Sequence, residues 1–340
     1  MKSIYSLTIT NLEEILVKNN FKKFNAKQIF EWLYKKRVHS FQDMSNLSKE
    51  LRAFLMDNYE MDLIMLKKEE VSLETNKYLF ELRDGNLIES VLMKHDYGNS
   101  ICVSSEVGCN MGCSFCESGR LKKVRDLTAD EMVTQILLIE SLTNQRIDSV
   151  VVMGIGEPFD NYDNVLDFIK IINNDYGISI GARHITVSTC GIVPKIYKFM
   201  EEQLQINLAL SLHAPNNELR SKLMNINKAY NIEEVMEAIK KYIVKTNRRV
   251  TIEYILLDNV NDSLENALEL CKLISGLNVY VNLIPYNETS NICFKRSKKV
   301  QTMKFYDILK KNNINVTIRR EFGKKISAAC GQLRASEVQK

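Results

Sequence analysis

Between about residue 100 and residue 320, short apolar runs alternate with helical segments, and this alternation constrains the fold more than any other feature of the chain. Near-continuous apolar strands joined by helical crossovers predict a parallel sheet that is covered on both faces. The expected strands span residues 101–107, 149–155, 185–189, 206–213, 250–257 and 279–286, and the expected helices include residues 129–143, 165–172, 232–245 and 263–274. We therefore predict an α/β fold, a partial (β/α)6 barrel of the TIM type.

The first hundred residues show a different pattern. Apolar residues recur every three or four positions in residues 11–20, 26–37 and 47–58, which predicts short amphipathic helices. Two strand-like runs, residues 77–83 and 87–93, flank Asp84-Gly85, a pair that favours a tight hairpin turn. We therefore expect a small helical N-terminal domain, a β-hairpin linker, the barrel and a C-terminal loop, with bounds at 1–60, 61–98, 99–320 and 321–340.

The composition excludes several classes of chain. With 45% hydrophobic and 26% charged residues, 13 glycines and 4 prolines, the chain is neither disordered nor collagen-like. Its formal charge of +4 names no partner. The N-terminal stretch lacks the apolar core of a signal peptide, and no run approaches the roughly 18 apolar residues of a membrane span. We therefore expect a cytoplasmic protein without a membrane partner.

The cysteines are unevenly distributed, because four of the eight lie between Cys102 and Cys116. In a reducing compartment, clustered cysteines are more often metal ligands or redox-active thiols than structural disulfides. The segment Cys109-Asn-Met-Gly-Cys113-Ser-Phe-Cys116 lets three thiolates converge on one inorganic centre. Three ligands are one fewer than a closed zinc site or an ordinary [4Fe–4S] cluster takes, which implies an open coordination position.

An open position on a [4Fe–4S] cluster is suited to binding the amino and carboxylate groups of S-adenosylmethionine and delivering an electron to it. Two other interpretations of the triplet remain at this point: three buried cysteines, or a zinc knuckle completed by a remote ligand. In a parallel barrel, chemistry collects at the carboxyl ends of the strands. Small and polar residues do follow the expected strands, at Gly108-Cys109, Gly156-Glu157, Thr189-Cys190, His213, Asp258 and Tyr286-Asn287.

With these motifs the chain resembles the radical S-adenosylmethionine superfamily, and within it the RlmN/Cfr family of ribosomal RNA adenine methyltransferases. The resemblance extends from the N-terminal domain to Cys330-Gly-Gln-Leu333. Its most specific segments are Met153-Gly-Ile-Gly-Glu-Pro158, Ser211-Leu-His-Ala-Pro215, Arg220-Ser-Lys-Leu-Met224, Asn282-Leu-Ile-Pro-Tyr-Asn287, Arg319-Arg-Glu-Phe-Gly323 and Ala328-Ala-Cys-Gly-Gln-Leu333.

The resemblance implies a set of site residues. The [4Fe–4S] cluster would be held by Cys109, Cys113 and Cys116. S-adenosylmethionine, two molecules per turnover, would be bound by Gly156, Glu157, Ser188, Ser211, Leu212, His213 and Asn287. Without the resemblance, His213 reads as a satisfied histidine at a strand end.

The resemblance also implies a two-step methyl transfer. Cys330 would first accept a methyl group, and a radical formed on that S-methyl carbon would then add to the adenine, giving a protein–RNA adduct. Glu89 would accept the proton whose loss precedes release, a role that asks for a pKa raised by partial burial. Cys102 would resolve the adduct through a transient disulfide with Cys330. Cys271 is expected in the core, and Cys190 and Cys293 have no assigned role.

The expected partners are 23S ribosomal RNA and an electron donor such as flavodoxin or ferredoxin, with transfer RNA left open as a second substrate and the chain acting as a monomer. The resemblance favours methylation of adenine C2. The alternatives are a C8 methyltransferase of the antibiotic-resistance branch and, in a different class, a non-catalytic zinc RNA-binding module. Two loops depart from the family pattern, Glu117-Ser-Gly-Arg-Leu-Lys-Lys-Val-Arg125 and Lys324-Lys-Ile-Ser327. We expect both near the substrate.

Overall fold

The computed structural model describes residues 1–289, 291–319 and 332–338 of the chain. Its centre is a ten-stranded sheet in the order β14-β13-β12-β11-β10-β9-β6-β5-β4-β3. Neighbouring strands from β6 to β14 are parallel, and β3 to β6 form an antiparallel extension. The strands are β3 (Met65–Val71), β4 (Thr75–Glu81), β5 (Leu87–His95), β6 (Gly98–Val103), β9 (Ser149–Val152), β10 (Ile185–Thr189), β11 (Asn207–Ser211), β12 (Val250–Leu256), β13 (Val279–Pro285) and β14 (Val316–Ile318).

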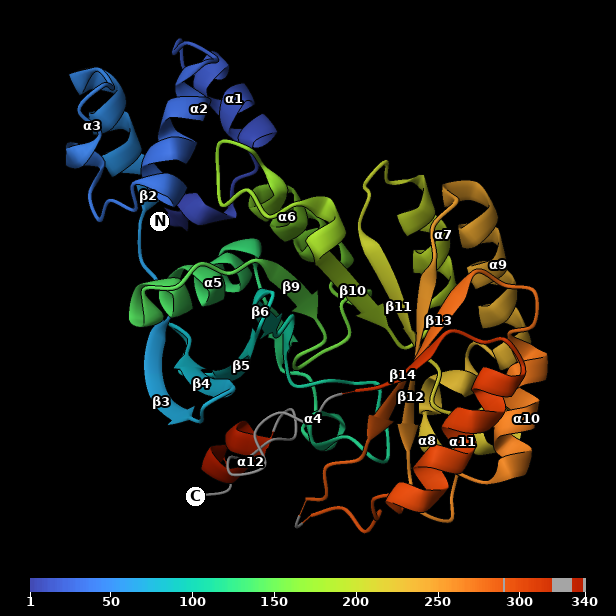
Figure 1. Cartoon of the computed structure of the whole chain (residues 1–340). Coiled ribbons are helices and arrows are strands. Elements are labelled where there is room, and N and C mark those ends of the chain that lie inside the picture. Colours follow the sequence, from blue (N-terminus) through green and yellow to red (C-terminus); the bar gives the residue numbers. More distant parts are fainter. Residues whose placement is uncertain (290, 320–331, 339–340) are drawn as a thin grey trace.

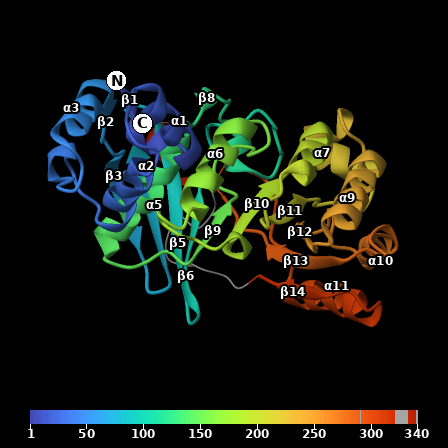
Figure 2. The ribbon, with the colours of Figure 1, turned by 90° about the horizontal axis from the view of Figure 1, so that it is seen from above.

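Helices cover the outer face of the curved parallel sheet, as Figures 1 and 2 show. Two of them begin with capping boxes, at Thr128 with Glu131 and at Asn231 with Glu234. The helices are α5 (Ala129–Thr143), α6 (Tyr162–Asn173), α7 (Val193–Glu201), α8 (Asn217–Leu223), α9 (Ile232–Thr246), α10 (Leu264–Leu273) and α11 (Lys299–Lys311), with 3-10 turns at Ala182–His184 and Asn225–Lys228. This confirms the predicted partial α/β barrel.

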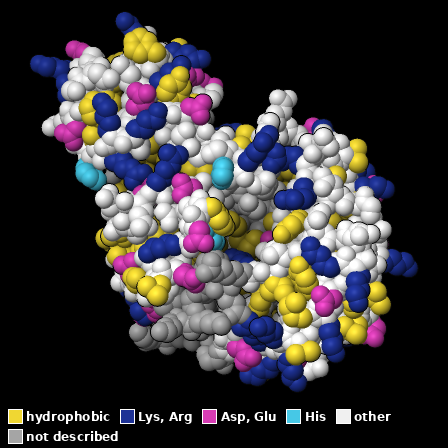
Figure 3. Space-filling view, in the orientation of Figure 1, with side chains coloured by type: hydrophobic (Ala, Val, Ile, Leu, Met, Phe, Trp, Pro, Cys, Tyr) yellow, Lys and Arg dark blue, Asp and Glu magenta, His cyan; other side chains and the backbone are white. Residues whose placement is uncertain are grey.

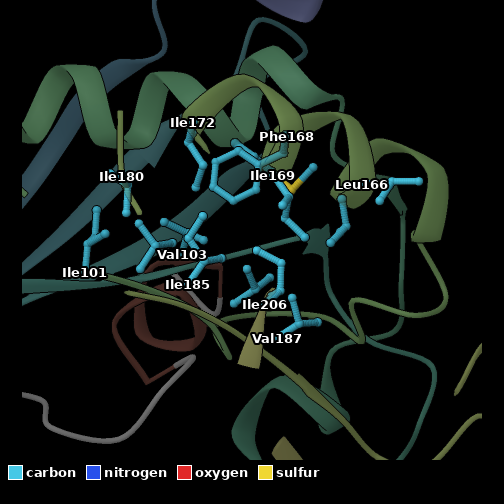
Figure 4. Packing of buried hydrophobic residues seen from close by; sticks show 14 of the residues in the cluster. Ile101, Val103, Leu166, Phe168, Ile169, Ile172, Ile180, Ile185, Val187 and Ile206 are labelled. Atoms are coloured by element: carbon cyan, nitrogen blue, oxygen red, sulfur yellow. The ribbon is translucent and has the colours of Figure 1, made fainter. Parts of the chain in front are cut away.

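The core lies between the sheet and these helices. Figure 4 shows Ile101 and Val103 of β6 beside Ile169 and Ile172 of α6, and all four are fully buried. Apolar residues of β6 thus meet the apolar face of α6. Within the described ranges, no helix combines the length and apolar character needed to cross a membrane.

Several details of the barrel differ from the prediction, and the strands expected at 149–155 and 206–213 end early, at Val152 and Ser211. The first strand, expected at 101–107, ends at Val103, because the N–H groups of Ser105 and Glu106 both turn to the carbonyl of Ile155, at 2.9 and 3.1 Å. The following residues form the short strand β7 (Glu106–Val107), which pairs with β8 (Arg125–Asp126). Strand β14 was not predicted, since three residues carry too short a pattern to recognise.

The predicted hairpin is present as β4 and β5, joined through Asp84-Gly85 with Gly85 at φ 78°. It does not stand apart from the barrel. Strand β5 pairs with β6, which in turn pairs with β9, so residues 65–95 extend the barrel sheet. The side chains of this extension therefore reach the same interior as those of the barrel.

The N-terminal residues form a helical lobe at one end of the molecule (Figure 1). Its helices are α1 (Ile9–Lys18), α2 (Asn25–Phe30) and α3 (Lys49–Asn58), with α1 and α3 capped by the side chains of Thr8 and Ser48. Shorter elements are β1 (Lys2–Ser3), which pairs with β2 (Tyr59–Glu60), the 3-10 turns Ile4–Ser6 and Phe41–Asp43, and a π-helical turn Glu31–Lys35. Arg37 joins the lobe to α5 through an ion pair with buried Glu140.

Candidate active site

A cavity of about 330 Å³ opens at the carboxyl ends of the barrel strands. Its lining comes from distant parts of the chain: the loop after β7, the ends of β9 to β13, and the inner faces of β4, β5 and β6. This is the end of the sheet where a parallel barrel collects its chemistry. The cavity lining includes all three thiols of the Cys109–Cys116 segment.

Backbone hydrogen bonds shape the loop that carries these thiols. The N–H of Cys109 donates to the carbonyl of Leu121 at 3.0 Å, and that of Cys116 donates to the carbonyl of Cys113 at 3.1 Å. Burial raises the pKa of the Cys109 thiol to about 12, and burial also raises the pKa values of Cys113 and Cys116. Buried thiols become thiolates when a cationic centre binds them, so this loop has the chemistry of a metal-cluster site.

The Gly156-Glu157 turn follows β9 and lines the same cavity as the thiols. Gly156 has φ 109°, and a Cβ there would lie 2.6 Å from the Cβ of Glu106, so only glycine fits. Buried Glu157 accepts backbone N–H bonds from Phe159 at 3.0 Å and from Cys190 at 2.8 Å, one on each oxygen. Burial raises the pKa of Glu157. The side chains of Thr189 and Cys190 are further hydrogen-bond partners of this carboxylate.

The ends of β10 and β11 bring hydroxyl groups to the same cavity. The Oγ atoms of Ser188 and Ser211 lie 3.2 Å apart, and both residues line the cavity. Asn287, which follows β13, also lines it. Leu212 is fully buried, and its N–H donates to the carbonyl of Glu253 at 3.1 Å, so its contribution is to the strand end.

His213 is a buried residue in the left-handed region, at φ 58°. Its Nδ1 accepts the N–H of Ile255 at 3.1 Å, and its ring meets that of Phe115 edge-on at 5.0 Å. Burial lowers the pKa of His213 to about 3, with the nearby Arg220 adding to the effect. The imidazole is therefore neutral at physiological pH, with Nδ1 occupied and Nε2 carrying the proton.

This arrangement predicts a pH dependence of stability. The pKa of His213 is about 3 in the folded chain against 6.5 for the free group, so its contribution is present above 6.5 and is lost as the pH falls toward 3. We expect the free energy of unfolding of the metal-free protein to fall less steeply over this range in His213→Asn. Asparagine tolerates the left-handed backbone and supplies a non-titrating acceptor. Equal slopes in denaturant titrations of the two proteins would contradict the assignment.

The wall formed by β4, β5 and β6 contains the expected resolving thiol, whereas the expected proton acceptor, Glu89, is not among the residues that line the cavity. Cys102 of β6 and Lys77 of β4 line the cavity, while Glu89 of β5 is paired with Leu79 in the sheet and lies beneath helix α12 (Gln332–Val338). Glu89 forms an ion pair with Lys77 at 3.0 Å and accepts the N–H of Arg334. Both charged side chains are only 1% exposed. Glu89 is thus fully buried rather than partly so, and it does not point to solvent.

Cys330 lies outside the described residues. The described residues that precede and follow the segment 320–331 lie close to strands β4 and β5. Arg319 lines the cavity, and Leu333 packs against Leu79 and Leu87.

Comparison with known proteins agrees with this geometry. The family model of the radical SAM superfamily matches residues 103–271, and that of the ribosomal RNA large subunit methyltransferase N-terminal domain matches residues 3–61. The chain is 54% identical to a probable dual-specificity RNA methyltransferase RlmN of Listeria monocytogenes, over 99% of the chain and 95% of that protein. The chain belongs to the RlmN family of radical SAM methyltransferases.

Two further relatives extend this result. A probable dual-specificity RNA methyltransferase RlmN of Acholeplasma laidlawii is 53% identical over 98% of the chain and 99% of that protein. The crystal structure of a radical SAM methyltransferase from Sphaerobacter thermophilus superposes with a TM-score of 0.91 at 42% identity, covering 98% of the chain and all of that structure. The predicted family and fold are therefore confirmed over nearly the whole chain.

Enzymes of the radical SAM superfamily use a [4Fe–4S] cluster and S-adenosylmethionine, and the cavity fits both. Cys109, Cys113 and Cys116 line one side of it as thiol donors. Within the described part of the chain, no three His, Cys, Asp or Glu side chains are placed to hold a single metal ion, and the three thiols line the cavity wall. The Gly156 turn and the hydroxyls of Ser188 and Ser211 provide room and hydrogen-bond partners for a cofactor beside it.

Several charged residues of the site escaped the sequence analysis. The sequence indicated only that Lys77 belongs to a hairpin and that Glu253 belongs to an apolar strand. Both residues line the cavity, and burial raises the pKa of Glu253. Glu253 accepts a hydrogen bond from Asn282 at 2.8 Å. Fully buried Arg220 donates to the carbonyl of Cys190 at 2.6 Å and to Asn227 at 2.9 Å. A single charged residue inside an apolar strand is the sequence signal that indicates such a site residue. Of these three residues, only Glu253 shows it.

The remaining cysteines and basic runs also have positions. Cys271 is buried in the main core, as expected, and Cys293 is exposed. In the basic run after the cluster, Lys123 pairs with Glu106 at 2.6 Å and Arg125 with Glu131 at 2.7 Å. That run therefore stabilises the β7–β8 region. Figure 3 shows Lys and Arg side chains spread over the front face rather than gathered in one patch.

Proposed function

We propose that this chain methylates carbon 2 of an adenosine in 23S ribosomal RNA, with transfer RNA as a second substrate. The observation that supports it is the convergence of three thiols, the Gly156-Glu157 turn and Cys102 on one cavity, in a chain 54% identical to a relative named as a dual-specificity RNA methyltransferase. Bound there, the cluster and S-adenosylmethionine would supply an electron, a radical and the methyl group.

The residues of the chain would fall into two groups, one that binds the cluster and the cofactor and one that transfers the methyl group. Cys109, Cys113 and Cys116 would hold the cluster, while Gly156, Glu157, Ser188, Ser211, Leu212, His213 and Asn287 would form the cofactor side. Neutral His213 would donate from Nε2, because Nδ1 is occupied by Ile255. Cys330 would carry the methyl group to the RNA base.

Release of the product would use residues of strands β4, β5 and β6. Glu89 would take the proton from the methylated carbon, and its carboxylate lies 3.0 Å from the Lys77 ammonium. The Cys102 thiolate would then attack the Cys330 sulfur and form a disulfide, while the electrons of the breaking C–S bond pass to the methylene carbon on the adenine, which takes up a proton to become the methyl group. Cys102 lines the cavity and is paired across the sheet with Val91, two residues along β5 from Glu89.

We further propose that the N-terminal lobe contributes to binding folded RNA, that a flavodoxin or ferredoxin supplies the electron, and that the enzyme works as a monomer in the cytoplasm. The match of residues 3–61 to the N-terminal domain of ribosomal RNA methyltransferases supports the role of the lobe.

The test is anaerobic reconstitution with iron and sulfide, followed by reaction with a 23S ribosomal RNA fragment and mass analysis of its nucleosides. We expect an oxygen-sensitive absorbing cluster, 5′-deoxyadenosine and 2-methyladenosine. Formation of 8-methyladenosine alone would replace the proposal by the antibiotic-resistance activity. Binding of one zinc ion without 5′-deoxyadenosine would replace it by a zinc RNA-binding module.

A further inference from the structure

Arg220, on helix α8, is a fully buried charge that the proposed mechanism does not use. Its Nη2 donates to the carbonyl of Cys190 at 2.6 Å and its Nη1 to the side chain of Asn227 at 2.9 Å, and both acceptors are neutral. Within the described residues, no carboxylate forms an ion pair with it. Burying a charge without an opposite charge is costly, so Arg220 calls for a counter-charge nearby.

Helix α8 is fastened to the loop that carries the three thiols. The N–H and Oγ of Ser114, inside that loop, donate to the carbonyl of Leu223 at 2.9 and 3.3 Å. Just after the helix, Asn225 donates from Nδ2 to the carbonyl of Gly112 at 3.3 Å. Leu223 lies about one helical turn after Arg220. The guanidinium is therefore held within one turn of the backbone that positions the thiols.

The charge of Arg220 also reaches the groups that line the cavity. Arg220 itself is not among the described residues of the lining, but Cys190, whose carbonyl it binds, packs in one apolar cluster with Cys113. Burial lowers the pKa of His213, and Arg220 adds to that effect. Burial raises the pKa of Cys113, and Arg220 opposes that rise. The guanidinium thus acts on the cavity by its field, through the wall.

Two anions are candidates for the counter-charge. Glu157 accepts the N–H of Cys190 at 2.8 Å, while Arg220 binds the carbonyl of the same residue, so the main chain of Cys190 separates the two charges. An iron–sulfur cluster held by three thiolates is also an anion, and its reduction adds one more negative charge. The fastening of α8 to the thiol loop favours the cluster.

We propose that Arg220 is the buried counter-charge of the reduced [4Fe–4S] cluster and thereby raises the reduction potential of that cluster. A fixed positive charge in an interior of low dielectric constant stabilises the reduced, more negative form over the oxidised form. Arg220 touches neither cofactor nor RNA, and its role is to ease the delivery of an electron to the cluster. This inference rests on the proposed cluster site at Cys109, Cys113 and Cys116.

The test is an anaerobic redox titration of the reconstituted full-length chain with dithionite, read by electron paramagnetic resonance of the reduced cluster. At equal ambient potential, Arg220→Gln is expected to lower the ratio of reduced to oxidised cluster about 10-fold, which is about 59 mV for a one-electron couple. Arg220→Met is a second neutral variant, with a flexible apolar side chain in the same space, and should show the same shift. Arg220→Lys keeps the charge and should keep the wild-type potential.

The matched control is Arg248→Gln, because half-buried Arg248 also donates to an asparagine side chain, that of Asn207 at 2.8 Å, but lies at the amino ends of the strands. It should keep the wild-type potential. Wild-type potentials in both neutral variants, or an equal shift in Arg220→Lys, would overturn the inference and leave the proposed cluster site intact. A wild type that binds zinc and no cluster would overturn the cluster site and the inference together.

Discussion

Replacing Cys330 by alanine is expected to reduce RNA methylation to background while leaving the iron content and the formation of 5′-deoxyadenosine from S-adenosylmethionine measurable. The physical reason is that the electrophilic amidine carbon of adenine does not accept a methyl group by simple displacement, so the proposed route needs a sulfur carrier. Among the described thiols, Cys109, Cys113 and Cys116 are the expected cluster ligands, Cys102 is the expected resolving thiol, and Cys271 lies in the core. Mass analysis of the RNA nucleosides gives the readout.

The companion variant Cys102→Ala is expected to trap a covalent protein–RNA adduct. With Cys330 able to react but no thiol to resolve it, the adduct would appear as a slow band on a denaturing gel, and Cys330→Ala in the same chain would abolish that band. Cys293→Ala is the control, since Cys293 is exposed on the loop before α11 and is expected to retain full methylation. Methylation that survives in Cys330→Ala would overturn the carrier mechanism.

Replacing Lys77 by methionine is expected to destabilise the fold by about 3–5 kcal/mol, the usual cost of leaving one partner of a buried ion pair without the other. Lys77 and Glu89 are each 1% exposed and lie 3.0 Å apart. Helix α12 would be affected as well, because Glu89 accepts the N–H of Arg334. Denaturant titration of the metal-free protein measures the loss.

Two further variants distinguish charge burial from simple loss of packing. The double variant Lys77→Met with Glu89→Leu removes both charges and should recover much of the lost stability. Lys67→Met breaks the comparable but partly exposed pair with Glu81 at 2.9 Å on the neighbouring strands, and it should cost no more than about 1 kcal/mol. A double variant no more stable than the single one would show that the buried charge is not the cause.

Much of the fold was predictable because its signals are local. Apolar strands, capping boxes and the Asp84-Gly85 turn each occupy a few consecutive residues, and their pattern indicated the parallel barrel and the N-terminal helices. The exceptions are equally informative. The end of β6 at Val103 depends on the carbonyl of Ile155, some fifty positions away in the sequence, and β14 is too short to carry a pattern.

The site divides in the same way. By itself, the sequence determined the thiol triplet, the glycine turn and the family, because each depends on residue types at short spacing. Only the tertiary structure decided that Lys77 forms an ion pair with Glu89, that the amide of Arg334 donates to the same carboxylate 245 residues away, and that Glu117 and Tyr286 line one cavity. These relations arise where separate strands and loops pack together, and a buried charge or an unpaired oxygen is defined by such neighbours rather than by its position in the chain.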